Sequence, residues 1–161
     1  MEKCGHYKYW KTDFDLVQEM GICFLCYRPT IHRTWLGEGK YDREFADQTL
    51  HDLRERDIVV IADLCHFGVP DWVGNFAEPD VPRLFTKFAR AFAQRCPWIQ
   101  LYTPVNEMYV CASFSAALGW WNEQLSRRSG IHHCAEAHGE GERLRDAGYH
   151  RRASRCHFRP E

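Results

Sequence analysis

Two polar residues that could take part in chemistry, Asn106 and Glu107, closely follow a stretch that predicts a strand. This stretch, Trp98–Tyr102, is rich in aromatic and branched residues, as strands usually are. Pro104 cannot donate a hydrogen bond to a sheet, so regular pairing should stop there. Proteins of the α/β class present their working residues just beyond the carboxyl ends of strands. Glu107 could therefore exchange a proton with a bound substrate, although a solvated loop pair would have the same sequence.

A histidine occupies the corresponding place after an earlier strand. Ile58–Ala62 is the clearest predicted strand of the chain, and it leads to His66 and a loop rich in Gly, Pro and Trp. Taken alone, His66 is a loop histidine that either contacts a ligand or makes a structural hydrogen bond. Asp63 and Asp71 are the other acids near these strand ends, and cap or loop roles are expected for them.

Helical and strand patterns alternate through most of the chain. Apolar residues at helical spacing predict helices over Thr12–Met20, from Asp42, from Asp80 with Pro82, and over Tyr109–Leu118. The continuous apolar run Ile22–Tyr27 predicts a strand covered on both faces, and Thr30–Lys40 predicts a loop. Such an alternation calls for parallel strands joined by right-handed crossovers. A barrel and a doubly wound sheet would both give this pattern.

The residues after the predicted strands resemble those of one enzyme family. The pair Asn106 and Glu107 resembles the acid/base motif of β-glycosidases built on (β/α)8 barrels, and glycoside hydrolase family 1, the β-glucosidase-like family, is most similar. The segment Leu64–Pro70 is similar to that family's Leu-His-His-Trp-Asp-Leu-Pro stretch, with His66 at the second histidine. It departs from that stretch at Cys65, Phe67 and Gly68. The resemblance covers roughly residues 6–124.

The resemblance implies retaining hydrolysis of a β-glycoside, which uses two carboxyl groups about 5–5.5 Å apart, one as nucleophile and one as acid/base. Glu107 would be the acid/base, with a pKa raised by burial and by the charge of its partner. Asn106 would contact the sugar 2-hydroxyl, and His66 another hydroxyl. The nucleophilic glutamate belongs near strand seven of the barrel and has no counterpart in these 161 residues, so the chain alone is expected to be inactive.

Further substrate contacts are implied around these residues. The family's arginine on the second barrel strand corresponds to Cys26 here. Arg28, two residues on and on the same face of the predicted strand, could replace it or simply anchor a loop. Trp72, Trp120 and Trp121 could stack on sugar rings, although tryptophans more often pack in cores or loops. Because the family's Trp and Asp after His66 are absent, the resemblance does not imply the family's usual sugar preference.

A complete (β/α)8 barrel needs about 250 residues, which exceeds the length of this chain. The predicted fold class is therefore α/β, a partial TIM (β/α)8 barrel of about three βα units that correspond to strands two to four. Its expected partners are a sugar or β-glycoside and either a complementing barrel half or a second copy of the chain. A carbohydrate-binding or assembly module without catalysis is the alternative function.

Composition limits the remaining function classes. The net charge of −1 provides no long-range attraction to nucleic acid, and the chain has no apolar run long enough for a membrane span. Without a signal-peptide pattern at Met1, the expected location is cytoplasmic. The eight cysteines are scattered, and Cys23 and Cys26 would point to opposite faces of a strand, so no metal is expected. No cofactor is implied either.

The last part of the sequence differs from the rest. Residues 1–126 form the predicted barrel part, whereas residues 127–161 contain eight Arg and five His without apolar periodicity. This tail is interpreted as the product of a shift of reading frame near Ser126 or as a disordered basic extension.

Overall fold

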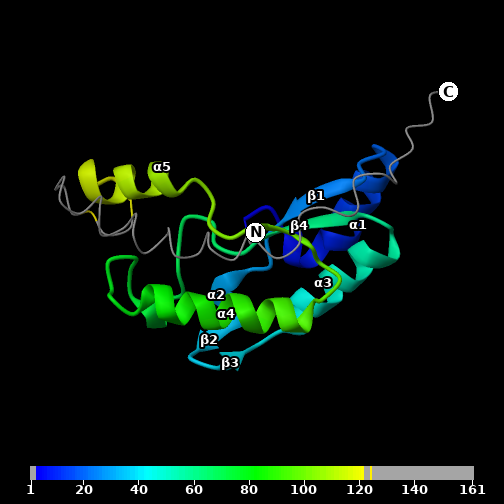
Figure 1. The fold of residues 1–161 in the computed structure, drawn as a ribbon. Helices are drawn as coiled ribbons and strands as arrows, with labels where there is room; N and C mark the ends of the chain where they lie inside the picture. Colours follow the sequence, from blue (N-terminus) through cyan, green and yellow to red (C-terminus); the bar gives the residue numbers. More distant parts are fainter. Residues whose placement is uncertain (1–2, 122–123, 125–161) are drawn as a thin grey trace.

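Three parallel strands form the main sheet of the computed structural model, which describes residues 3–121 and 124. Strands β1 (Phe24–Tyr27), β4 (Val59–Asp63) and β5 (Leu101–Thr103) lie in the order β1-β4-β5, with β4 in the centre (Figure 1). Both pairs of neighbours are parallel. The predicted parallel α/β arrangement is confirmed, and the three strands do not close into a barrel.

Helices connect the strands as the apolar spacing predicts. Helix α1 (His6–Glu19) precedes β1, α3 (Glu44–Glu55) precedes β4, and α4 (Val81–Arg95) precedes β5. Figure 1 shows α3 and α4 on the same side of the sheet. The predicted start of α4 is confirmed, because Asp80 is its N-cap and a proline occupies its first turn. Asp42 also acts near a helix start, since its Oδ1 accepts a hydrogen bond from the Glu44 N–H at 3.2 Å.

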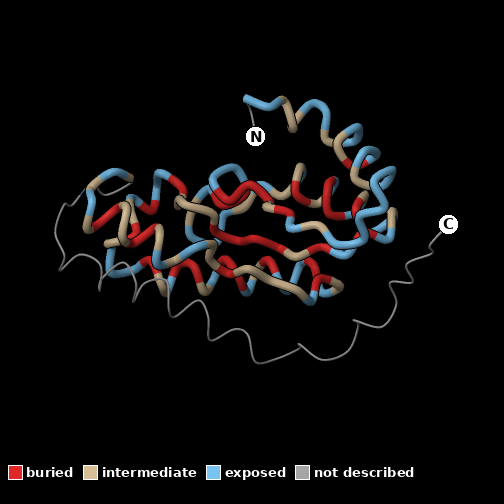
Figure 2. The backbone as a smooth tube through the Cα atoms, turned by 90° about the horizontal axis from the view of Figure 1, so that it is seen from above, coloured by how far each residue is buried: buried red, intermediate tan, exposed pale blue. Residues whose placement is uncertain are grey.

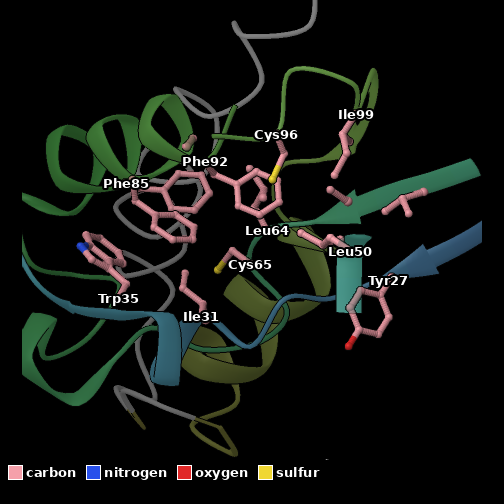
Figure 3. Close-up of a cluster of buried hydrophobic side chains, with 14 of the residues drawn as sticks. Tyr27, Ile31, Trp35, Leu50, Leu64, Cys65, Phe85, Phe92, Cys96 and Ile99 are labelled. Atoms are coloured by element: carbon pink, nitrogen blue, oxygen red, sulfur yellow. The ribbon is translucent and has the colours of Figure 1, made fainter. Parts of the chain in front are cut away.

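The hydrophobic core lies between the sheet and these helices. Buried positions run through the middle of the molecule and recur along the inner sides of the helices (Figure 2). Side chains that are distant in sequence meet there, as Figure 3 shows for Trp35, Leu50, Cys65, Phe85 and Phe92. Burial of this apolar surface is the main stabilising contribution expected for the sheet and its helices.

The prediction of a loop over Thr30–Lys40 is wrong. The segment holds a short helix, α2 (Ile31–Thr34), followed by an antiparallel hairpin of β2 (Trp35–Gly37) and β3 (Lys40–Tyr41). Trp35 explains this order, because it is 1% exposed and its ring stacks on Phe88 of α4 with centroids 5.1 Å apart. The contact joins residues far apart in the sequence, which local patterns cannot reveal.

The predicted start of α1 at Thr12 is also wrong, because the helix begins at His6. Its first turn is held by long-range contacts: the Tyr7 hydroxyl donates to Thr30 Oγ1 at 2.9 Å, and His6 Nε2 lies 3.2 Å from the Tyr27 hydroxyl. Thr12, expected at the start of the helix, lies inside it and is exposed.

The predicted strand Trp98–Tyr102 is shorter and later in the structure. Strand β5 begins at Leu101, because the Ile99 N–H donates to the Cys96 carbonyl at 3.0 Å and thus forms a turn. The strand ends at Thr103, directly before Pro104, as predicted. Beyond it, the predicted helix is present as α5 (Met108–Ala112) and a π-helical turn, η2 (Ser113–Ala117).

One face of the sheet is open, which corrects the prediction that the first strand is covered on both faces. Phe24 of β1 and Val59 of β4 are partners in the strand register and are 42% and 40% exposed, respectively. Cys26, two residues along β1, is exposed on the same face. The helices therefore cover the other face alone within residues 3–121.

Candidate functional site at the carboxyl ends of the strands

A pocket of about 450 Å³ opens beyond the carboxyl ends of β1 and β4. Three of the predicted substrate-binding residues, Arg28, His66 and Trp72, line it together. Trp35 and Asp71 contribute further to its wall. The pocket combines a cationic side chain, a carboxylate, two indole rings and the imidazoles of His66 and His32, which suits a polar ligand that also has an apolar face.

The His66 ring is hydrogen-bonded to a buried carboxylate. Its Nδ1 lies 2.5 Å from Oδ2 of Asp63, the last residue of β4, whose side chain is almost completely buried. The His66 ring also contacts the Phe67 ring edge-on, with centroids 4.4 Å apart. The imidazole is thus fixed on two sides, while about a third of its side chain remains exposed to the pocket.

Arg28 follows the last residue of β1 and bridges to the neighbouring loop. Its Nη1 donates to the His66 carbonyl at 3.3 Å. The prediction that Arg28 shares a strand face with Cys26 is wrong, because β1 already ends at Tyr27. Arg28 reaches the pocket from the loop instead.

Trp72 lies in the short 3-10 helix η1 (Asp71–Val73) and is fixed by a second tryptophan. Its Nε1 donates to the Trp35 carbonyl at 2.8 Å, and the two rings meet at 89° with centroids 4.9 Å apart. Trp72 is therefore fixed by one hydrogen bond and one perpendicular ring contact, and the side chain remains partly exposed at the pocket.

Asn106 and Glu107 lie on the loop after β5, next to the His66 loop. The Asn106 N–H donates to the Cys65 carbonyl at 2.8 Å, and the Leu64 N–H donates to the Thr103 carbonyl at 3.0 Å. These two bonds continue the contact between β4 and β5 beyond the regular ladder. The backbones of the two predicted site segments, around His66 and Asn106, are consequently tied together.

Glu107 has an unusual backbone conformation and is exposed. It is the N-cap residue of α5 and lies in the left-handed region, with φ 46° and ψ 52°. The burial that the resemblance implies for an acid is absent from this part of the chain, because the Glu107 side chain is exposed. Neither Asn106 nor Glu107 is among the residues that line the pocket.

Trp121, another predicted stacking residue, lies apart from the pocket lining, as does Trp120. Its ring contacts Phe67 and Phe114, with centroids 5.0 and 4.8 Å away. Since Phe67 also contacts His66, Trp121 supports the His66 loop through one intermediate ring. It is only partly buried, so part of its surface remains accessible.

The cysteine thiols do not form a metal site in the described residues, where no group of three or more His, Cys, Asp or Glu side chains could hold an ion. Cys23 precedes β1 and Cys26 lies within it, and both are exposed. Burial raises the pKa of the Cys65 thiol to about 12, so this thiol is protonated at neutral pH. The described helices include none that is long and apolar enough to cross a membrane.

The sequence predicts only a cap or loop role for Asp63, yet this residue makes the shortest polar contact of the site. One signal pointed to it: an acid at the end of a strand, three residues before a candidate histidine. The involvement of Trp35 had no such signal, because it depends on the packing of the hairpin against α4.

These features define an α/β protein with part of a parallel barrel and a pocket at the carboxyl ends of its strands. No family model and no curated protein matches the sequence. Solved structures do match the fold, and among them are β-glucosidases and a β-glycosidase.

A β-glucosidase from Thermotoga maritima in complex with deoxynojirimycin matches 88% of this chain with a TM-score of 0.79 and 18% identity. A β-glycosidase from Pyrococcus horikoshii matches with a TM-score of 0.78 and 19% identity. The AHE enzyme from Alicyclobacillus herbarius matches with a TM-score of 0.75 and 24% identity.

The chain covers 35–36% of the length of these three structures. A family 1 β-glucosidase from Thermotoga maritima has the same partial match. The fold is thus that of part of a family 1 β-glucosidase TIM barrel, as the resemblance in the sequence predicts.

Proposed function

We propose that this chain provides the β-glycoside-binding part of a retaining β-glycosidase, with Glu107 as the acid/base. The observation that supports this most directly is the pocket shared by Arg28, His66 and Trp72 at the carboxyl ends of the strands. This is where barrel enzymes hold their substrates. The fold shared with β-glucosidases agrees with the same function.

In this proposal each pocket residue has a distinct task. His66 forms a hydrogen bond with a sugar hydroxyl, as donor or as acceptor, and Arg28 donates a hydrogen bond to another hydroxyl. The partly exposed ring of Trp72 packs against the apolar C–H face of the sugar, a contact of about 1 kcal/mol if it resembles other aromatic contacts. Asn106 and Glu107 act at the glycosidic bond from the neighbouring loop, with Asn106 contacting the 2-hydroxyl.

The proposal also includes a complementing partner. Retaining hydrolysis needs a nucleophilic carboxylate, and removing one of two cooperating groups removes the covalent route. The open face at Phe24 and Val59 would be covered by the rest of a barrel, either as another segment or as another molecule. With its exposed Cys23 and Cys26 thiols, the chain suits a reducing compartment such as the cytoplasm.

Binding of methyl β-glucoside to the 161-residue chain tests the proposal. We expect saturation on titration by calorimetry, with affinity weakened roughly tenfold when His66→Ala or Trp72→Ala removes one contact. Tyr109→Ala is the matched control, because Tyr109 is exposed and does not line the pocket. Absence of binding, or equal loss in the control, would overturn the pocket assignment.

A nitrophenyl β-glucoside assay tests the catalytic half. We expect no turnover above background for the chain alone or for Glu107→Gln. Turnover by the chain that Glu107→Gln abolishes would contradict the need for a partner while supporting the role of Glu107. The substitution keeps the size and backbone of residue 107, so it changes the carboxyl chemistry with little effect on the fold.

A carbohydrate-binding module without catalysis is the second candidate. The exposed position of Glu107 outside the pocket lining favours it, since binding would then not require this residue. The two functions separate when a complementing barrel half is supplied: binding without turnover in that mixture favours the module.

A further inference from the structure

Asp63 is a buried acid, and only one of its two carboxylate oxygens has a hydrogen-bond partner among the described residues. It is 3% exposed, and its Oδ2 lies 2.5 Å from His66 Nδ1. Its other oxygen, Oδ1, is buried and has no hydrogen-bond partner within the described part of the chain. A buried polar atom without a partner costs about 1–3 kcal/mol. Asp63 therefore lowers the stability of the folded state through its unpaired oxygen.

The nearby groups do not neutralise this carboxylate by direct contact. Arg28 approaches the same loop, but its hydrogen bond goes to the His66 carbonyl and not to Asp63. The pKa of Cys26 is raised by desolvation and also by the negative charge of Asp63. The charge of Asp63 thus affects a thiol on the neighbouring strand β1, while its direct contact within residues 3–121 is with His66.

A carboxylate next to one ring nitrogen restricts the state of the other. A neutral imidazole carries a single N–H, and an ionised carboxylate can only accept hydrogen bonds. When Asp63 Oδ2 accepts from Nδ1–H, the second nitrogen, Nε2, is left with its lone pair. Nε2 makes no hydrogen bond to a described residue, and the His66 side chain is partly exposed at the pocket.

We propose that Asp63 is a positioning residue that keeps the proton of His66 on Nδ1, so that Nε2 accepts a hydrogen bond from a hydroxyl group of the ligand. This inference rests on the proposed function for the identity of the ligand, a β-glycoside. The protonation state of Nε2 determines which ligand groups can bind next to it, which the shape of the pocket alone does not. Ligand groups that donate hydrogen bonds fit at Nε2, whereas ether oxygens at the same place do not.

The tautomer of His66 can be measured without any ligand. In long-range ¹H–¹⁵N spectra of the ¹⁵N-labelled full chain at about pH 8, a neutral imidazole gives one pyrrole-type and one pyridine-type nitrogen. We expect the pyrrole-type signal at Nδ1 of His66, which a His66→Gln sample identifies by its absence. A pyrrole-type Nε2, or two pyrrole-type nitrogens, would overturn the proposal.

Asp63→Asn then changes the carboxylate to an amide of similar shape that can donate to Nδ1. We expect the tautomer to reverse, with the proton on Nε2, and methyl β-glucoside binding to weaken roughly tenfold, the effect of one lost hydrogen bond. Asp57→Asn is the matched control, because Asp57 is exposed, does not line the pocket and has a left-handed backbone conformation that asparagine tolerates. It should leave both the tautomer and the affinity unchanged.

The two readouts separate this inference from the proposed function. If the native chain shows the Nδ1–H tautomer but binds no glucoside, the proposed function fails and the tautomer control by Asp63 stands. If glucoside binds but Asp63→Asn alters neither tautomer nor affinity, the inference fails and the proposed function stands. Should Asp63→Asn not fold, the spectrum of the native chain still decides the tautomer.

Discussion

Truncation of Trp35 should destabilise the chain far more than truncation of a tryptophan at the surface. Trp35 is 1% exposed, stacks on Phe88 and meets Trp72 edge-on. It thereby fixes the β2–β3 hairpin against α4 and also supports the wall of the pocket. Trp35→Ala removes both ring contacts and leaves a cavity between the hairpin and the helix.

The size of the effect follows from burial and from the two ring contacts. Replacing a buried tryptophan by alanine costs about 3–5 kcal/mol. Each aromatic pair contributes about 0.5–1.5 kcal/mol beyond its buried area, so we expect a value near the upper end, about 4–5 kcal/mol. Small domains have total stabilities of about 5–15 kcal/mol. The substitution should therefore remove a large fraction of the stability.

Urea unfolding followed by far-ultraviolet circular dichroism measures this loss. With a urea dependence of about 2 kcal/mol per molar, the midpoint should fall by about 2 M. Trp120→Ala is the control, because Trp120 is 65% exposed, and it should change stability by less than about 1 kcal/mol. A Trp35→Ala midpoint within about 0.5 M of the native value would refute the proposed packing of the hairpin on α4.

Three further predictions concern thiols, helix packing and the open face. Burial raises the pKa of the Cys65 thiol from 9.0 to about 12, so between these pH values the unfolded state loses this proton while the folded state keeps it. The free energy of unfolding should therefore fall between pH 9 and 12. A thiol reagent at pH 8 should label Cys23 but not Cys65, as measured by mass spectrometry. Arg56 Nη1 lies 2.7 Å from Asp15 and joins α3 to α1, so Arg56→Met should cost about 1 kcal/mol in urea unfolding, and no loss would contradict this link. We expect copies of the chain to associate through the open face, so Val59→Lys should reduce self-association measured by sedimentation velocity. Unchanged association would contradict a contact between copies at this face.

The elements with strong local signals were predicted well. Helix α4 combines Asp80 at the N-cap position, a proline in its first turn and apolar residues on one side, and it begins where expected. The central strand β4 is displaced by one residue from the prediction, because the Ile58 N–H donates to the Leu53 carbonyl instead of entering the ladder. Continuous apolar runs separated by amphipathic helices were sufficient to predict parallel strands.

The elements that depend on distant contacts were not predictable from local patterns. The hairpin at Trp35 is ordered by Phe88, and the early start of α1 is held by the bond from Tyr7 to Thr30. Neither partner lies within one helical turn of the residue that it fixes. Strand β1 contained apolar residues typical of a strand covered on both faces, yet Phe24 remains partly exposed in the described residues.

The candidate site was predictable in part. Loops after parallel strands lie at one edge of a sheet, which is sufficient to bring Arg28 and His66 to the same pocket. The exposure of Glu107 and the bond of Asp63 to His66 depend on the exact conformation of the loops. Sequence spacing does not specify these conformations.

Glu107, the residue proposed as the acid/base, has a left-handed backbone conformation. A residue with a Cβ atom in this conformation costs about 1–2 kcal/mol, a penalty that glycine avoids. Selection of random variants for heat resistance alone would thus favour glycine at position 107 and discard the carboxyl group. Engineering of this protein toward thermal robustness should keep Glu107 unchanged, because the most readily gained improvement would remove the carboxyl group that we propose as the proton donor.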